Sequence, residues 1–129
     1  MLLGFVAGRA LSDRTLAFLQ WVCSQLAPKG ARNLLMIWDK ATWHTSQQVR
    51  SWLKAHNQQG RLDWREGKAG LPIIPCFLPV RSPWLNSIEP CWLHGKRAVV
   101  EPTSKLTSTE LVNRVYAHFK LAPLPFIAQ

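Results

Sequence analysis

The sequence contains few cysteines and no pair of the kind that builds a zinc site or a redox centre. Cys23, Cys76 and Cys91 are odd in number and far apart, and no CxxC motif is present. We therefore expect three reduced, buried thiols. The pattern excludes the classes of protein that depend on a disulfide framework or on a cysteine-ligated metal.

Long apolar runs are also missing. No stretch approaches the roughly 20 apolar residues that a membrane span requires. The opening residues 1–8, MLLGFVAG, lack the basic start of a signal peptide and lead quickly to Arg9 and Asp13. These absences predict a protein of the reducing cytoplasm that has no membrane partner.

Acidic residues are also few. Seven Asp and Glu oppose sixteen Lys and Arg, which gives a formal net charge of +9 and an isoelectric point near 10.2. Such an excess favours an anionic partner, and nucleic acid is the first candidate. The basic residues are spread from Arg9 to Lys120, which indicates a charged face on a folded domain. The alternative is a solvated basic surface without a partner.

With 129 residues, 47% of them hydrophobic, the chain can bury one core but is too short for two ordinary domains. Short apolar runs predict strands at residues 1–6, 34–38 and 71–78, the second of them central and buried. Apolar residues at helical spacing predict helices at residues 12–26, 45–57, 86–98 and 108–119. Residues 58–70 are expected to form a loop and residues 121–129 a tail. This alternation predicts an α/β fold with three strands.

Two carboxylates follow predicted strands of this sheet. Asp39 closes the apolar run 34–38, and Glu89 opens the helix that comes after the run 71–78. Paired carboxylates at strand ends could hold the divalent ions of phosphodiester chemistry. Each also has a structural interpretation, because Asp39 could cap its turn and Glu89 could form a capping box with Asn86.

Two segments carry a family resemblance. WDKATWH at 38–44 resembles the D-N-A-x-W-H segment around the second acidic residue of mariner-superfamily transposases, in their bacterial insertion-sequence branch. FLPVRSPWLNSIEPCW at 77–92 resembles the segment L-P-x-x-S-P-x-L-N-x-I-E-x-x-W, which holds the third acidic residue of the same family. The second match is the more specific, and the two occur in the expected order.

The resemblance implies a partial RNase H-like fold in which residues 1–120 belong to a DDE catalytic domain. Asp39 and Glu89 would be the second and third acidic residues of the triad, holding two Mg²⁺ or Mn²⁺ ions. The first Asp and the first strands of the sheet are expected upstream of residue 1. The implied partners are DNA, both transposon ends and target, and a second copy of the chain in a homodimer. The implied location is the bacterial cytoplasm, in association with the nucleoid.

Other residues would support this site. Lys40 replaces the usual Asn after the second acidic residue and could contact phosphate or weaken metal binding. The candidate DNA contacts are Lys40, Arg81, Lys96 and Arg97, although a solvated helix end explains the last two equally well. Trp43, His44 and Asn86 are expected to support the loops around the carboxylates. Among the seven tryptophans, Trp38, Trp52 and Trp92 are expected to face the core, which leaves Trp43, Trp64 and Trp84 for base stacking.

Two functions follow as expectations. The first is DNA strand cleavage and joining of the transposase type, expected to be inactive in this chain because the first Asp of the triad is missing. The second is a catalytically inert remnant that binds DNA through phosphate contacts. A chain without the first strands would also expose a sheet edge that is prone to association.

Overall fold

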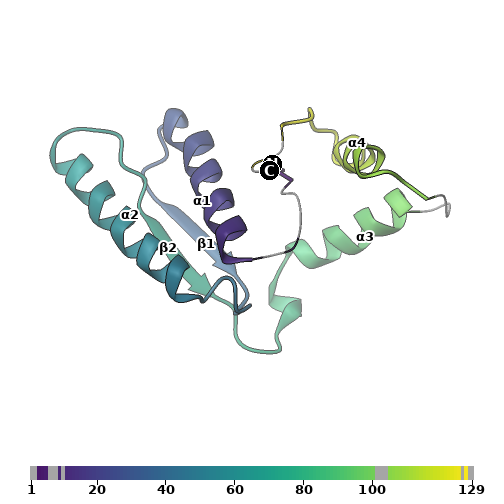
Figure 1. The fold of residues 1–129 in the computed structure, drawn as a ribbon, viewed down its shortest axis with the longest axis horizontal. Helices are drawn as coiled ribbons and strands as arrows, with labels where there is room; N and C mark the ends of the chain where they lie inside the picture. Colours follow the sequence, from purple (N-terminus) through teal and green to yellow (C-terminus); the bar gives the residue numbers. More distant parts are fainter. Residues whose placement is uncertain (1–2, 6–8, 10, 101–104, 126, 128–129) are drawn as a thin grey trace.

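A computed structural model describes residues 3–5, 9, 11–100, 105–125 and 127. The chain is an α/β domain with a small parallel sheet (Figure 1). Its elements are α1 (Ser12–Leu26), β1 (Leu34–Trp38), α2 (Gln47–Arg65), β2 (Ile73–Phe77), α3 (Ile88–Val100) and α4 (Ser108–His118). Two short 3₁₀ turns, η1 (Ala27–Lys29) and η2 (Pro83–Leu85), complete the order. The predicted helices and the last two predicted strands are therefore present.

The core lies between the sheet and two helices. β1 and β2 pair in parallel, with Leu34 opposite Ile73 and Trp38 opposite Phe77. α1 and α2 cover one face of this pair, as Figure 1 shows. The buried side chains there are Leu19 of α1, Trp38 of β1, Val49 and Leu53 of α2, and Ile73 of β2. Each comes from the apolar stripe or strand that the sequence pattern identifies, so burial of these stripes explains the layer order.

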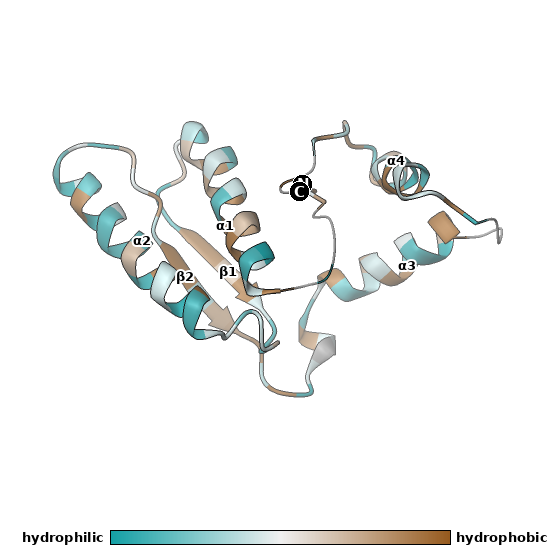
Figure 2. Cartoon of the chain, viewed as in Figure 1, coloured by the Kyte–Doolittle hydropathy of each residue, from teal (hydrophilic) through white to brown (hydrophobic). Residues whose placement is uncertain are grey.

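The other face of the sheet is bare, and this corrects the prediction of a buried central strand. Leu35 is 58% exposed and Ile37 55% exposed, while Ile74 on β2 is 53% exposed. Both strands are apolar on both faces (Figure 2), but the described residues place helices over only one of them. A continuous apolar run is typical of a strand covered twice, so the pattern over-predicts burial here.

The strand predicted at residues 1–6 is not formed by the residues that the structure describes there. Residues 3–5 have no strand structure, and the carbonyl of Phe5 instead accepts a hydrogen bond of 2.9 Å from the backbone N–H of Ile127. The remaining positions of that prediction lie outside the described residues. In the described part of the chain the sheet therefore has two strands rather than three.

α2 extends eight residues beyond its predicted end, through the stretch expected to be a loop. The side chain of Ser46 caps its start by accepting a bond from the N–H of Val49. Gly60 does not break this helix because it is buried where Gly70 and Pro72 approach the helix backbone. A Cβ atom on Gly70 would overlap the carbonyl group of Gly60. The two glycines thus allow close packing of the backbones. In the sequence pattern the same glycines indicate a loop.

The proline in β2 costs the ladder no hydrogen bond. The N–H of Leu34 donates to the carbonyl of Pro72, and the N–H of Leu78 donates to the carbonyl of Trp38. By the alternation of a parallel ladder, the missing N–H of Pro75 therefore faces away from β1. Asn57 of α2 pairs with that same outer edge, since its amide bonds both the N–H and the carbonyl of Ile73. The free edge of β1, at Leu35 and Ile37, has no such protection among the described residues.

α3 and α4 pack against each other, apart from the sheet (Figure 1). α4 begins with a capping box in which Thr107 and Glu110 exchange side-chain and backbone bonds. Its Tyr116 is 1% exposed and donates its hydroxyl hydrogen to the carbonyl of Leu3. Within the described residues, no helix is both long enough and apolar enough to cross a membrane.

The cysteines depart from expectation. All three are free thiols, as predicted, but Cys76 and Cys91 are exposed and only Cys23 is partly buried. Cys76 belongs to the uncovered face of the sheet, and Cys91 of α3 lines a cavity with Leu3 and Phe18. Their exposure follows from the same bare surfaces that the apolar pattern does not reveal.

Candidate active site

Asp39 follows the last residue of β1, and its side chain is 64% exposed. Its Oδ1 atom accepts a hydrogen bond of 3.0 Å from the N–H of Ala41 and lies 2.8 Å from Nδ1 of His44. Both contacts fall on one carboxylate oxygen, and among the described residues Oδ2 has no protein partner. Asp39 therefore closes its turn, as its structural interpretation predicts, and still presents one oxygen to a ligand.

Glu89 lies in the first turn of α3. The backbone N–H of Glu89 donates to the carbonyl of Asn86 at 3.0 Å, which closes the turn before the helix. Its carboxylate makes no hydrogen bond within the described part of the chain, so the capping box that the spacing from Asn86 allows is not formed. The exposed carboxylate is available for another partner.

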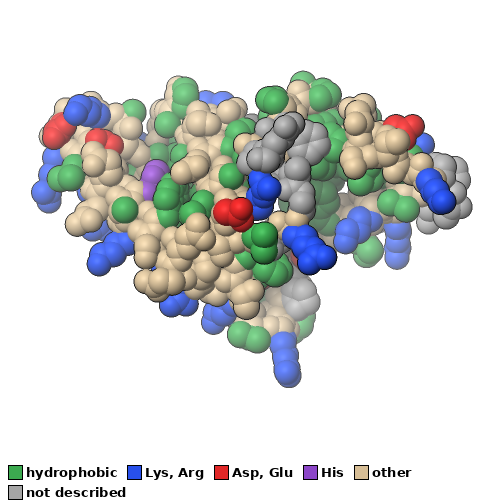
Figure 3. Space-filling model, in the orientation of Figure 1, with side chains coloured by type: hydrophobic (Ala, Val, Ile, Leu, Met, Phe, Trp, Pro, Cys, Tyr) green, Lys and Arg blue, Asp and Glu red, His purple; other side chains and the backbone are tan. Residues whose placement is uncertain are grey.

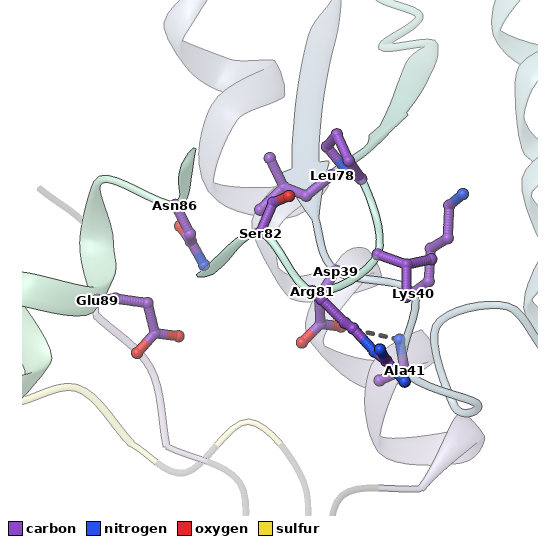
Figure 4. A pocket seen from close by; sticks show the side chains of 10 residues that line it. Asp39, Lys40, Ala41, Leu78, Arg81, Ser82, Asn86 and Glu89 are labelled. Carbon is purple, nitrogen blue, oxygen red and sulfur yellow. Dashed lines mark hydrogen bonds between the residues drawn. The ribbon is translucent and has the colours of Figure 1, made fainter. Parts of the chain in front are cut away.

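The two carboxylates line one cavity of about 320 Å³ at the carboxyl end of β1 and β2. Figure 4 shows Asp39 and Glu89 pointing into the same space, one from the loop after β1 and one from α3. Eight further residues line the cavity: Lys40, Ala41, Leu78, Pro79, Val80, Arg81, Ser82 and Asn86. Ligand sites of open α/β sheets occupy this position, outside the carboxyl ends of the strands.

The cavity also contains two cationic side chains. Lys40 extends away from the space between the carboxylates, whereas the side chain of Arg81 runs past Asp39 (Figure 4). Arg81 has φ of 59°, a left-handed conformation that a residue with a Cβ adopts only under constraint. Such strained positions concentrate at ligand sites. The loop thus holds a guanidinium beside a carboxylate-lined cleft.

The remaining predicted residues lie outside this cavity. Trp43 and His44 line a neighbouring apolar groove of about 570 Å³ between α1, β1 and α3, together with the buried Trp38. Lys96 and Arg97 are exposed on α3, two turns beyond Glu89. The structure therefore gathers Asp39, Lys40, Arg81, Asn86 and Glu89 in one site and leaves the other four residues around it.

The groove adds residues that the sequence patterns do not identify. Arg9 and Arg14 stand among its lining residues, on the amino-terminal side of α1. Neither belongs to a motif, so only their approach to β1 in space relates them to the site. Ser82 and Val80, in contrast, lie within the segment 77–92 and could have been named from it.

The donor set fits a hard divalent cation. Asp39 and Glu89 offer carboxylate oxygens, and Asn86 and Ser82 add neutral oxygens in the same cavity. Mg²⁺ is commonly bound through one or two carboxylates while it keeps water and substrate phosphate as further ligands. Within the described residues no cluster of three or more His, Cys, Asp or Glu side chains is present. Two protein carboxylates are therefore what this part of the chain supplies.

A basic α/β domain with a carboxylate-lined cleft at the carboxyl edge of its sheet has the features that metal-dependent cleavage of nucleic acid requires. The family model of the DDE superfamily endonucleases matches residues 3–111. The chain therefore belongs to the DDE superfamily endonuclease family. Members of this family generally use divalent metal ions and act on DNA. Comparison with curated proteins and with solved structures gives no significant match.

Proposed function

We propose that the chain performs DNA strand cleavage and joining of the transposase type, in the mariner-superfamily branch of bacterial insertion sequences. The observation that carries the proposal is the convergence of Asp39 and Glu89 on one cavity, although a helix and a strand separate them in the sequence. In this reaction water attacks a phosphodiester and releases a 3′ hydroxyl, which then attacks a target phosphodiester. The substrate is DNA in the bacterial cytoplasm, and a homodimer would bring two DNA ends together.

Asp39 and Glu89 would hold the divalent ions of the reaction, Mg²⁺ or Mn²⁺. When bound, such ions activate the attacking oxygen and stabilise the charge on the leaving oxygen. The protein's part is to keep the carboxylates in place. His44 and the N–H of Ala41 hold the side chain of Asp39, and the first turn of α3 positions the backbone of Glu89 at the cavity. Arg81 and Lys40 add positive charge that attracts the phosphates of the DNA.

One measurement tests this function directly. The chain is incubated with supercoiled plasmid and Mg²⁺ or Mn²⁺, and nicked product is compared with that of Asp39→Asn and Glu89→Gln. The matched control is Asp63→Asn with Glu66→Gln, which makes the same chemical changes at the far end of α2. Nicking that is lost in the site variants and retained in the control supports the proposal. Nicking that survives both site variants contradicts it.

The second candidate function is the inert DNA-binding remnant. It is favoured by the two acidic side chains that the described residues place at the cavity, fewer than a complete triad, and by Lys40 beside them. In that case DNA binding is sensitive to salt, indifferent to Mg²⁺, and unchanged in Asp39→Asn. Binding of Mn²⁺, followed by its electron paramagnetic resonance signal in the wild type and in both site variants, separates the two candidates without an activity readout.

A further inference from the structure

α2 carries a row of positive charge on one side. Arg50, Lys54, Arg61 and Arg65 are all exposed. Their spacings of four, seven and four residues place them within a sector of about 60° at 3.6 residues per turn. The row extends over about 22 Å at a rise of 1.5 Å per residue.

The row is not neutralised by nearby acids. The single acidic residue of α2, Asp63, lies on the opposite side of the helix and accepts a bond from Gln59. The ion pairs among the described residues are His44 with Asp39 and Lys68 with Glu66, and neither uses a cation of the row. Figure 3 shows Lys and Arg side chains along the outer margin of the molecule on the side that α2 forms, with acidic side chains beside them at its upper end.

The helix presents this row on a fixed support. Val49 and Leu53 are buried against the sheet, and Gly60 is buried under the loop before β2. The apolar side of α2 is occupied by the core. The exposed large hydrophobic residues of the helix are Leu62 and Trp64, single residues on opposite flanks of the row, which do not form the continuous apolar stripe that enters a membrane surface. A straight row of cations on a rigid helix instead matches the phosphates of a duplex, which carries one charge per roughly 1.7 Å of axis.

The row also begins near the candidate active site. α2 starts three residues after His44, which contacts Asp39, and its first turn lies by the carboxyl ends of the strands (Figure 1). The helix then runs away from the cavity. A duplex that enters the cavity could therefore continue along α2, with phosphates outside the reacting step on the row.

We propose that Arg50, Lys54, Arg61 and Arg65 form a second DNA-binding surface, separate from the carboxylate cavity, that binds duplex DNA through its backbone phosphates. The proposal rests on the proposed function only in taking DNA as the partner. It requires neither the metal ions nor the carboxylates. Because phosphate contacts carry no sequence information, this surface adds affinity and orientation rather than recognition of a particular site.

The test uses the full chain and a fluorescein-labelled duplex of mixed sequence, with binding followed by anisotropy between roughly 50 and 200 mM salt. In the row variant Arg50, Lys54, Arg61 and Arg65 become Gln. In the control variant Arg32, Lys68, Lys105 and Lys120, all exposed and outside the row and the cavity, become Gln. Both variants lower the formal net charge from +9 to +5. Circular dichroism establishes that each retains its helices.

The row variant is expected to bind the duplex at least about tenfold more weakly, and its salt dependence should fall by about 0.9 per lost phosphate contact. The control should stay close to the wild type. Replacement of the three arginines of the row by Lys keeps the charge and should keep the binding. Equal losses in the two charge-matched variants would overturn the proposal, as would unchanged binding in the row variant. Competition of anionic vesicles for the row against the duplex would overturn it as well.

Failure of this inference is distinguishable from failure of the proposed function. Metal-dependent nicking reports on the proposed function, whereas the difference in duplex binding between the row variant and its charge-matched control reports on the row. Absence of metal-dependent nicking in the wild type, together with loss of binding in the row variant, would contradict the proposed function and support the second DNA-binding surface. Nicking by the wild type, together with equal binding in the two charge-matched variants, would support the proposed function and contradict the second DNA-binding surface.

Discussion

Nδ1 of His44 lies 2.8 Å from Oδ1 of Asp39, while the imidazole ring stacks on Trp38 with 4.9 Å between ring centroids. Stacking on Trp38, which is buried in the core, keeps the imidazole ring within reach of the carboxylate. The exposed side chain of Asp39 is therefore oriented by His44, which is itself held by stacking on Trp38. From this arrangement we propose that His44 positions Asp39 and takes no direct part in the chemistry.

His44→Ala should therefore reduce metal-dependent nicking by roughly 10- to 100-fold, the usual loss when the partner that orients a metal ligand is removed. His44→Asn, whose amide can still donate to Asp39, should recover part of the loss. The measurement is the initial nicking rate together with the affinity for Mn²⁺. A rate equal to that of the wild type in both variants would show that Asp39 needs no such support.

The contact between Gly60 and Gly70 should be visible in stability. Gly70→Ala is expected to lower the free energy of unfolding by about 1–3 kcal/mol, because its Cβ would overlap the Gly60 carbonyl group. Gly60→Ala should be close to neutral, since a gain in helix propensity of about 1 kcal/mol offsets a tight contact of 3.3 Å with Pro72. Urea unfolding of both variants checks the order. A neutral Gly70→Ala would show that the loop does not pack on α2.

The three thiols should differ in reactivity. Burial raises the pKa of the Cys23 thiol above its ordinary value of 9.0, which leaves less of the reactive thiolate at neutral pH. Cys76 and Cys91 are exposed. An aromatic disulfide reagent should modify these two first, and the rate at Cys23 should rise only at more alkaline pH. Peptide mapping by mass spectrometry assigns the sites, and early modification of Cys23 would contradict its burial.

The bare face and free edge of β1 should drive self-association. Leu35→Lys and Ile37→Lys place charges on this exposed surface, and charged residues are a common protection of sheet edges. Both variants are expected to sediment as smaller species than the wild type at the same concentration. Met36→Lys, on the face that α1 and α2 cover, is the control and should unfold the domain. A wild type that is monomeric at every concentration would contradict the prediction.

Much of the site could be predicted from short segments. Asp39 and Glu89 each follow a strand pattern, and Arg81 and Asn86 are predicted beside them within the segment 77–92, which also contains Ser82. The structure adds that the carboxylate of Glu89 does not turn back to cap its helix, which the spacing alone leaves open. Arg9 and Arg14 could not be predicted, because they approach the site only through the packing of α1 beside β1.

The fold shows the same division in α2. The sequence predicts a helix start capped by Thr45 or Ser46, and Ser46 is the residue that caps it. Whether the helix ends early depends on Gly60, because the conformation that a glycine favours depends on the residues packed against it. Alone, a glycine in a polar stretch favours a loop. Against Gly70 and Pro72 it is the residue that allows a close approach of two backbones, and the helix continues to Arg65.

The sequence by itself determined the four helices, two strands, the excess of positive charge and the two carboxylates, because periodicity, capping and net charge are local or additive properties. Only the tertiary structure decided which surfaces those elements share. It brought Asp39 and Glu89 to one cavity, aligned four cations along the outer side of α2, and left Leu35 and Ile37 uncovered. The physical reason is that the burial of a side chain, and the meeting of two distant side chains at one site, depend on what packs beside them in space. The residue pattern of one strand does not specify which element packs against it.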